Sequence, residues 1–128
     1  HVSNFRHARK MKIPNVKIID PGQTPWKVIH EIAGCSRIFS ESLHGLIVAD
    51  TLNIPNVWIA PNPSMTGAKF KFDDYFSTLD ASKDAYPFSL MTFSSTPKDA
   101  FTVCQYLYDK QTYLDAIRDA TLGGTSIF

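Results

Sequence analysis

Short apolar runs alternate with amphipathic helical patterns through the first half of this 128-residue chain. Residues 16–20, 37–39 and 56–60 are rich in β-branched and aromatic side chains and are predicted to be strands, whereas residues 25–33 and 46–52 show the apolar spacing of helices. The expected order is β-α-β-α-β, which favours a parallel sheet of at least three strands with right-handed crossovers. The predicted fold class is therefore α/β, a parallel sheet with flanking helices.

The first helix has sequence signals at both ends. Thr24 offers an N-cap, and Pro25 suits the first helical position because its missing N–H costs nothing there. Gly34 follows the last helical residue and marks the stop. Trp26 in this helix and Trp58 in the third predicted strand are both expected in the core.

The second half of the chain is less regular. Residues 73–79 favour a short helix and residues 81–96 a loop, and a long helical stretch is expected from Thr96 to just before Gly123. A chain of 128 residues that is 44% hydrophobic can bury one substantial core, so a single domain over residues 1–128 is predicted.

Composition excludes several functions. A formal net charge of +1 provides no overall basic field for nucleic acid, and no apolar run reaches membrane-spanning length. Cys35 and Cys104 form no CxxC, which favours buried free thiols of an intracellular protein. No P-loop or GxGxxG occurs, and no metal site is expected because zinc-site spacing is absent from the histidines: His1, His7, His30 and His44.

Polar side chains stand directly before an apolar helical run in the stretch ESLHG, residues 41–45. As a strand-to-helix turn, it would lie where ligands bind in open α/β sheets, with free N–H groups at the helix start that favour an anion. His44 can donate a hydrogen bond to an anion or move a proton near neutral pH, Ser42 adds a hydroxyl, and Gly45 allows close approach. An ionised Glu41 would repel a bound anion, so the acid and the imidazole together suggest proton transfer.

Structural interpretations of the same residues stay open. His44 is equally well explained as a buried imidazole bonded to a backbone carbonyl, and Ser42 as a plain N-cap. Glu41 could pair with a nearby lysine or a backbone N–H. Lys69 and Lys71 could be an ordinary solvated pair.

The order of motifs resembles the C-terminal half of the polysaccharide pyruvyl transferases, particularly the succinoglycan-type ketal pyruvate transferases. The resemblance covers roughly residues 30 to 80 and rests on Ser-Leu-His-Gly at 42–45, Ile-Pro at 54–55, the strand after it, and a later motif formed by Lys71, Phe72, Asp74 and Tyr75. Some members have arginine where this chain has Ser42, and a serine cannot supply the forked donors of arginine to a carboxylate.

The resemblance implies a Rossmann-like C-terminal half of a GT-B-like two-domain enzyme, with the N-terminal domain absent from this chain. The implied reaction transfers pyruvate from phosphoenolpyruvate, a donor substrate and not a cofactor, to hexose hydroxyls of an exopolysaccharide or cell-surface glycan, forming a ketal. The implied partners are this small-molecule donor, a glycan or lipid-linked saccharide acceptor and the missing domain. A cytoplasmic location is expected, with peripheral association at the inner face of the membrane left open.

Roles follow for the candidate residues within this resemblance. His44 would donate the proton or bind phosphate, and Glu41 would carry acid/base work on the donor or the sugar. Lys71, with Lys69 as the second choice, would stabilise phosphate or carboxylate charge, and His1 would also lie on the active rim.

Two other function classes remain as alternatives. A nucleotide-sugar-binding C-terminal domain of a GT-B glycosyltransferase would use the same rim for a diphosphate and a ribose, with Glu41 on the ribose. A non-catalytic anion-binding or docking domain would need no chemistry from His44.

Overall fold

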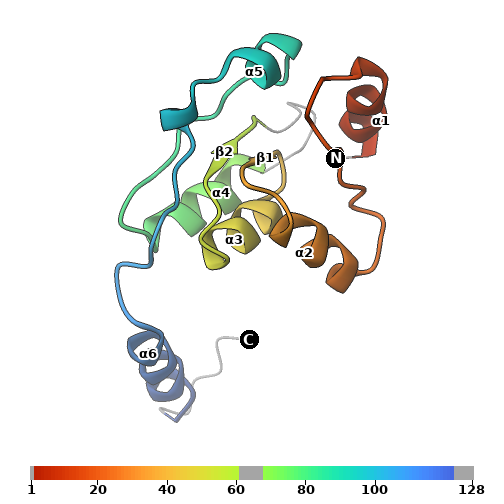
Figure 1. Ribbon diagram of the computed structural model, residues 1–128. Coiled ribbons are helices and arrows are strands. Elements are labelled where there is room, and N and C mark those ends of the chain that lie inside the picture. Colours follow the sequence, from red (N-terminus) through yellow and green to blue (C-terminus); the bar gives the residue numbers. More distant parts are fainter. Residues whose placement is uncertain (1, 61–67, 123–128) are drawn as a thin grey trace.

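A computed structural model describes residues 2–60 and 68–122 of the chain (Figure 1). Its helices and strands are, in order, α1 Val2–Met11, α2 Pro25–Ala33, β1 Ile38–Ser40, α3 Leu43–Thr51, β2 Asn56–Trp58, α4 Ala68–Ser77, α5 Leu90–Ser95, the 3₁₀ helix η1 Lys98–Ala100 and α6 Lys110–Leu122. The predicted site residue His1 lies outside the described residues.

The two strands pair in parallel, with Ile38 opposite Asn56 and Ser40 opposite Trp58. Helix α3 connects them, as a crossover must when consecutive strands run in the same direction. The fold is therefore mixed α/β, a small two-stranded parallel sheet flanked by helices (Figure 1). The predicted parallel α/β arrangement is confirmed.

The predicted first strand, residues 16–20, is wrong. This segment has no regular secondary structure, and the only ladder among the described residues joins β1 to β2. Ile19 packs against a core cluster that contains Ile32, Ile38 and Ala49. The β-branched side chains of residues 16–20 thus favour burial against α2 and α3, although the backbone of this segment pairs with no strand that the structure describes. A high strand propensity largely reflects how well a side chain packs when buried, so it does not by itself predict backbone pairing.

The helices around the sheet begin close to the predicted caps. Helix α2 starts at Pro25 as expected, although the N-cap Thr24 makes no side-chain capping bond. Trp26 is 81% exposed, so its predicted place in the core is wrong. It occupies the first turn of α2, whereas the buried residue of this helix, Ile32, lies near its end. Trp58 is buried as predicted.

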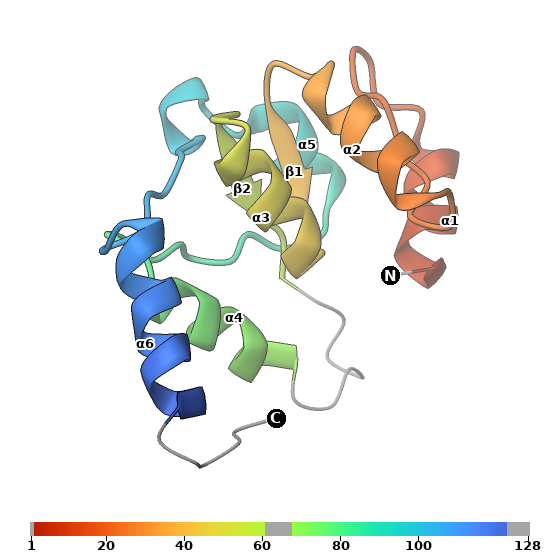
Figure 2. The ribbon, with the colours of Figure 1, turned by 90° about the horizontal axis from the view of Figure 1, so that it is seen from below.

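Side chains divide between the two faces of the sheet as strand alternation requires. Ile38 and Trp58 belong to clusters formed with α2, α3 and α4. Phe39 and Val57 instead join a cluster with Phe93 of α5. The view in Figure 2 agrees, with α3 on the near side of the strands and α5 behind them.

The predicted loop and long helix of the second half need correction. Helix α4 begins at Ala68, earlier than expected, and residues 90–95 of the predicted loop form α5. Ser89 caps α5, because its hydroxyl accepts a hydrogen bond from the Thr92 N–H at 3.1 Å. The helix expected from Thr96 onward is limited to the short η1 and, after a non-helical segment, α6.

Tertiary pairing explains why residues 101–109 are not helical. The N–H of Asn56 donates to the carbonyl of Thr102 at 2.9 Å, and the Thr102 N–H donates back at 3.1 Å. The spacing of Phe101 and Cys104 suggested one face of a helix. Both side chains are buried, but the segment that carries them is not helical. Covering the open edge of β2 satisfies backbone groups that a local helix would leave exposed on the strand.

Both cysteines are free thiols, with Cys104 buried and Cys35 half-buried. Among the described helices, none combines the length and apolar character needed to cross a membrane.

Candidate functional site

The turn between β1 and α3, residues 41–45, is called the rim turn below. It follows the carboxyl end of β1, and the register of Ser40 with Trp58 places the end of β2 at the same edge of the sheet. Ser42 occupies the N-cap position of α3. His44 lies in the first helical turn and is exposed, and Glu41 is half-buried and has an interaction partner. The predicted strand-to-helix turn is confirmed, and the buried interpretation of His44 is wrong.

Ser40 ties the rim turn together, a role that the sequence did not reveal. Its buried hydroxyl donates to the Ser42 carbonyl at 2.8 Å and accepts from the Ser42 N–H at 3.1 Å. The Ser42 hydroxyl makes no capping bond and is exposed. The hydroxyl that stabilises the start of α3 is thus that of Ser40, not that of the predicted cap Ser42. The Ser42 side chain remains exposed to solvent.

Gly45 is required by packing between α3 and β1. A Cβ added at this position would collide with Ser40 Oγ and lie 3.2 Å from Ser40 Cβ. The absence of a side chain therefore lets the first turn of α3 approach the strand that precedes it. This reason is structural, and a contact between Gly45 and a ligand stays a prediction.

The two candidate lysines lie on α4. The Lys69 ammonium forms an ion pair with Asp73 at 2.7 Å, and both side chains are largely exposed. The Lys71 ammonium lies 5.5 Å from the centroid of the Phe72 ring. Lys69 also lines an open hollow beside Trp58, at the end of β2. Glu41, Ser42, His44 and Gly45 thus share the rim turn, whereas both lysines belong to a different helix, α4.

A buried carboxylate cluster lies at the other end of α3. Asp50 is 8% exposed and accepts hydrogen bonds from Asn56 Nδ2 at 2.8 Å, the Tyr75 hydroxyl at 2.9 Å and the Cys104 N–H at 3.1 Å. Burial, followed by the charge of Asp50, raises the pKa of Tyr75 well above its ordinary range. The cluster joins α3 to α4 and to the chain beside β2, and no local sequence signal predicted it.

Lys83 closes the edge of β2, also without a sequence signal. Its ammonium donates to the carbonyls of Asn56 at 3.1 Å and Thr102 at 2.9 Å, and to the Thr102 hydroxyl at 2.7 Å. Burial lowers the pKa of Lys83. Its three donors are used within the protein, which makes Lys83 a clamp between β2 and the segment that covers it.

No group of three or more histidine, cysteine, aspartate or glutamate side chains converges on a metal-binding geometry within residues 2–60 and 68–122. The rim turn instead carries an exposed imidazole three residues after a half-buried carboxylate, at the edge where two parallel strands end. Such a pair can bind an anion or exchange protons with a ligand near neutral pH.

Comparison with known proteins finds one family. Residues 2–63 match the family model described as polysaccharide pyruvyl transferase. The succinoglycan biosynthesis protein ExoV of Rhizobium meliloti is 38% identical over 61 residues, which is 48% of this chain and 19% of that protein. An uncharacterized protein of Acanthamoeba polyphaga mimivirus is 35% identical over 57 residues, 44% of this chain and 20% of that protein. The matches thus span about a fifth of these relatives, and no solved structure matches.

Proposed function

We propose that this chain, of which residues 2–63 match the polysaccharide pyruvyl transferase family model, contributes to transfer of pyruvate from phosphoenolpyruvate to a glycan. The acceptor is a pair of hydroxyls on a hexose of an exopolysaccharide or cell-surface saccharide, and the product is a cyclic ketal. The single observation that carries this proposal is the exposed His44, which lies three residues after Glu41 in the rim turn, at the strand-end edge within the family-matched segment.

The reaction requires three changes at phosphoenolpyruvate. Its methylene carbon gains a proton and becomes the methyl group of the ketal, and the neighbouring carbon becomes electrophilic. Two sugar oxygens then bond to that carbon, and the bond to the phosphate oxygen breaks. Of the two hydroxyl protons, one balances the proton given to the methylene and the other leaves with inorganic phosphate. A residue that donates a proton and one that accepts it are therefore both needed.

The rim turn suits these proton transfers. An imidazole changes charge near neutral pH, so His44 is assigned protonation of the methylene carbon or a hydrogen bond to the departing phosphate. Glu41 is assigned removal of a sugar hydroxyl proton. The N–H groups at the start of α3 favour an anion, and the exposed Ser42 hydroxyl adds a donor. Lys71 supplies positive charge from α4, whereas Lys69, the second choice, is held in an ion pair with Asp73.

The proposed architecture is a Rossmann-like C-terminal half of a GT-B-like enzyme. The parallel pairing of β1 and β2 through α3 supports a Rossmann-like unit, and the short match to much longer relatives supports a second domain. The second domain would face the rim turn and position the acceptor. We propose a cytoplasmic enzyme that acts on glycans or lipid-linked saccharides at the inner face of the membrane.

Release of inorganic phosphate from phosphoenolpyruvate, dependent on a saccharide acceptor, tests this function in the full-length protein. His44→Ala is expected to lower turnover by about 100-fold or more, the usual contribution of a general acid or base. Glu41→Gln keeps the size of the side chain and should also reduce turnover. His30→Ala is the matched control, because His30 is an exposed histidine on the neighbouring helix α2.

The same measurements separate the alternatives. Turnover that is unchanged in both His44→Ala and Glu41→Gln would contradict the catalytic proposal. Binding of a nucleotide sugar, with no binding of phosphoenolpyruvate, would instead favour the glycosyltransferase alternative. Binding of phosphoenolpyruvate without acceptor-dependent phosphate release by the full-length protein would favour an anion-binding domain.

A further inference from the structure

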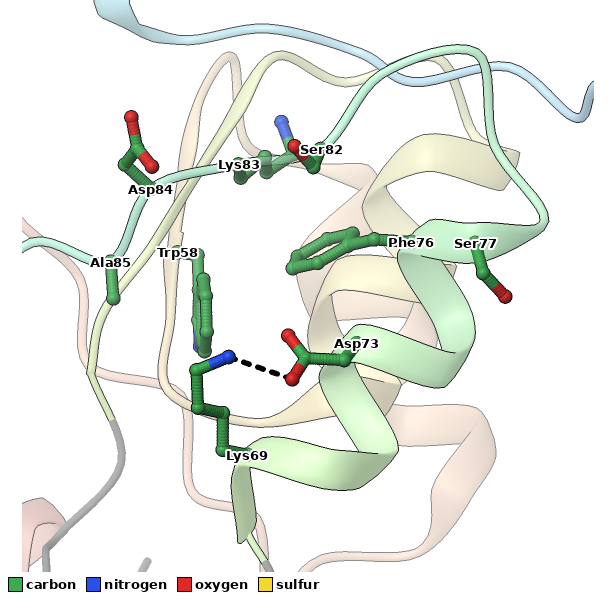
Figure 3. A pocket seen from close by; sticks show the side chains of 9 residues that line it. All are labelled: Trp58, Lys69, Asp73, Phe76, Ser77, Ser82, Lys83, Asp84 and Ala85. Atoms are coloured by element: carbon green, nitrogen blue, oxygen red, sulfur yellow. Dashed lines mark hydrogen bonds and ion pairs between the residues drawn. The ribbon is translucent and has the colours of Figure 1, made fainter.

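An open hollow of about 500 Å³ lies beside the end of β2, apart from the residues of the rim turn. Segments from three parts of the chain form it: Trp58 of β2, one side of α4, and residues 82–85 (Figure 3). Trp58 is opposite Ser40 in the parallel register, so the hollow and the rim turn lie at the same edge of the sheet. This volume falls within the range of small-ligand sites in proteins.

The charges around the hollow balance. Its lining contains two lysines and two aspartates: Lys69, Lys83, Asp73 and Asp84. Lys69 is paired with Asp73 at 2.7 Å, as the dashed line in Figure 3 shows. Lys83 directs its ammonium to Asn56 and Thr102. With no net positive charge and both ammonium groups engaged, the lining is poorly suited to phosphate or to phosphoenolpyruvate.

The remaining polar groups suit a ligand that carries hydroxyls. Asp84 provides an exposed carboxylate that accepts hydrogen bonds, and Ser82 provides a hydroxyl that both donates and accepts. The Ser77 hydroxyl already donates to the Asp74 carbonyl at 2.6 Å, so it can only accept a hydrogen bond from a ligand. A neutral sugar has many hydroxyls and can pair with donors and acceptors alternately around its ring.

Two buried polar atoms near the hollow have no hydrogen-bond partner within residues 2–60 and 68–122. Trp58 Nε1 is a donor and Asn56 Oδ1 an acceptor, and neither forms a hydrogen bond with the part of the chain that the structure describes. Asn56 lines a smaller hollow of about 200 Å³, which shares Trp58, Ser82, Lys83 and Asp84 with the larger one. Buried polar atoms normally have partners, so this donor and acceptor leave hydrogen-bonding capacity directly beneath the groove. Both atoms are covered in this structure, and a ligand hydroxyl would reach them only after a neighbouring side chain moves.

Aromatic packing holds the floor of the hollow rigid. Trp58 stacks on Phe72 with ring centroids 4.7 Å apart and meets Phe76 edge-on at 5.3 Å. The Lys69 side chain is 79% exposed, so it can swing away from the indole when a ligand enters. The fixed part of the site is therefore apolar and the movable part polar, a common division in ligand pockets.

We propose that this hollow is a subsite for one neutral hexopyranose unit of the acceptor saccharide, next to the rim turn that carries the chemistry. The assignment rests on the proposed function for the identity of the ligand as the acceptor. The hollow itself, with Trp58, Asp84 and Ser82, defines the chemical class of that ligand as an uncharged sugar.

Fluorescence titration of the 128-residue chain with methyl hexopyranosides of glucose and galactose tests the subsite. The chain has two tryptophans, so Trp26→Phe leaves Trp58 as the reporter. Trp26 is 81% exposed, and its replacement should not disturb the fold. A saturable change in Trp58 emission is expected, with a dissociation constant on the order of millimolar for so small a ligand.

Two variants test where the sugar binds. Asp84→Asn and Ser82→Ala, each in the Trp26→Phe background, should weaken binding by about fivefold, the loss expected for one hydrogen bond. Asp74→Asn is the matched control, because Asp74 is an exposed carboxylate on α4 that does not line the hollow. The proposal would be overturned if Trp58 emission did not change at sugar concentrations well above millimolar. It would also be overturned if both variants bound the sugar as tightly as the Trp26→Phe chain.

Inorganic phosphate and phosphoenolpyruvate serve as competing probes. Neither is expected to change Trp58 emission through this hollow. An emission change with phosphate that Asp84→Asn strengthens would identify an anion site and overturn the proposal. The outcome is independent of the proposed function: loss of sugar binding with His44-dependent phosphate release intact removes only the subsite, whereas sugar binding without phosphate release in the full-length protein removes only the enzyme.

Discussion

The two ends of helix α3 carry polar residues in opposite environments. At its start, the rim turn exposes His44 and Ser42 to solvent. At its end, Asp50 is buried and accepts three hydrogen bonds, from Asn56, Tyr75 and the Cys104 N–H. The polar groups at the start are thus available to a ligand, while those at the end are occupied by the protein itself.

This difference in burial separates polar residues that are available for function from polar residues that stabilise the fold. A buried polar group contributes to stability because removing its partner strands a donor or an acceptor away from water. An exposed side chain has water as a substitute, so its loss changes stability little. Polar side chains on one nine-residue helix, α3, are therefore expected to give very different results when they are removed.

Removal of the Asp50 carboxylate should have the largest effect on stability. Asp50→Ala strands the Tyr75 hydroxyl and the Cys104 N–H, and we expect the free energy of unfolding to fall by about 3 kcal/mol or more. Urea denaturation followed by circular dichroism measures this loss. Asp74→Ala, an exposed carboxylate on α4, is the control and should change stability by less than about 0.5 kcal/mol. Equal losses in both variants would remove the distinction between the two ends.

Substitution of Gly45 should have the next largest effect, because it tests packing within the rim turn. Alanine normally stabilises a helix relative to glycine by up to about 1 kcal/mol. Here the new Cβ meets Ser40, so Gly45→Ala is expected to destabilise the fold by about 1–3 kcal/mol. Ser40→Ala removes the hydroxyl that the Cβ would strike, and the double variant should recover part of the loss. Additive losses in the urea midpoints would contradict this contact.

Alkaline pH should weaken the buried end in particular. Burial raises the pKa of Cys104 above 9.0 and that of Tyr75 above 10.0, so the folded chain keeps protons that the unfolded chain releases. For these two groups the unfolded state then binds fewer protons, and each lowers the free energy of unfolding by about 1.4 kcal/mol per pH unit above its ordinary pKa. Burial lowers the pKa of Lys83, which acts in the opposite direction up to about pH 10.5, so the net fall is expected above that pH. Stability measured by urea titration at several pH values checks this slope.

Tyr75→Phe should reduce the alkaline slope above pH 10, where the ordinary tyrosine titrates. It keeps the ring of Tyr75 and removes only the hydroxyl that donates to Asp50. A slope that stays the same in this variant would show that other groups cause the pH dependence.

The smallest effect on stability is expected at the start of α3. His44 is exposed, so His44→Ala should change the free energy of unfolding by less than about 0.5 kcal/mol while turnover of the full-length enzyme falls. Thermal and urea unfolding, compared with His30→Ala, check this point. A large loss of stability in His44→Ala would show that His44, like Asp50, stabilises the fold.

Local signals predicted α2, β1, α3 and β2 but neither α1 nor the irregular segment at residues 16–20. Pro25 and Gly34 marked the ends of α2, and Ser42 marked the start of α3, because caps and helix breakers act on their own neighbours in sequence. The same reasoning placed the rim turn, but it left open whether the His44 imidazole is buried or exposed. It did not find Ser40, whose hydroxyl is no different in sequence from any other serine beside a turn.

Long-range contacts explain why the predicted secondary structure was wrong in two other segments, residues 16–20 and 101–109. The helical spacing of Phe101 and Cys104 was correct as a sign of burial and wrong as a sign of helix, since this segment pairs with Asn56 at the edge of β2. Residues 16–20 were buried without becoming a strand. In both cases the apolar pattern correctly predicted which side chains are at least partly buried. It did not predict the backbone hydrogen bonds, because these depend on residues far away in the sequence.

The amino-acid sequence by itself determined the order of the central elements, the parallel pairing and the rim turn with its acid and imidazole, because each depends on residues close together in the chain. Only the tertiary structure decided which polar groups are buried. Asp50 meets Tyr75 and Cys104 across 25 and 54 residues of sequence, and Lys83 reaches Thr102 across 19. Such partners are chosen by packing, since a buried charge or hydroxyl must find a hydrogen bond wherever the fold brings one within reach.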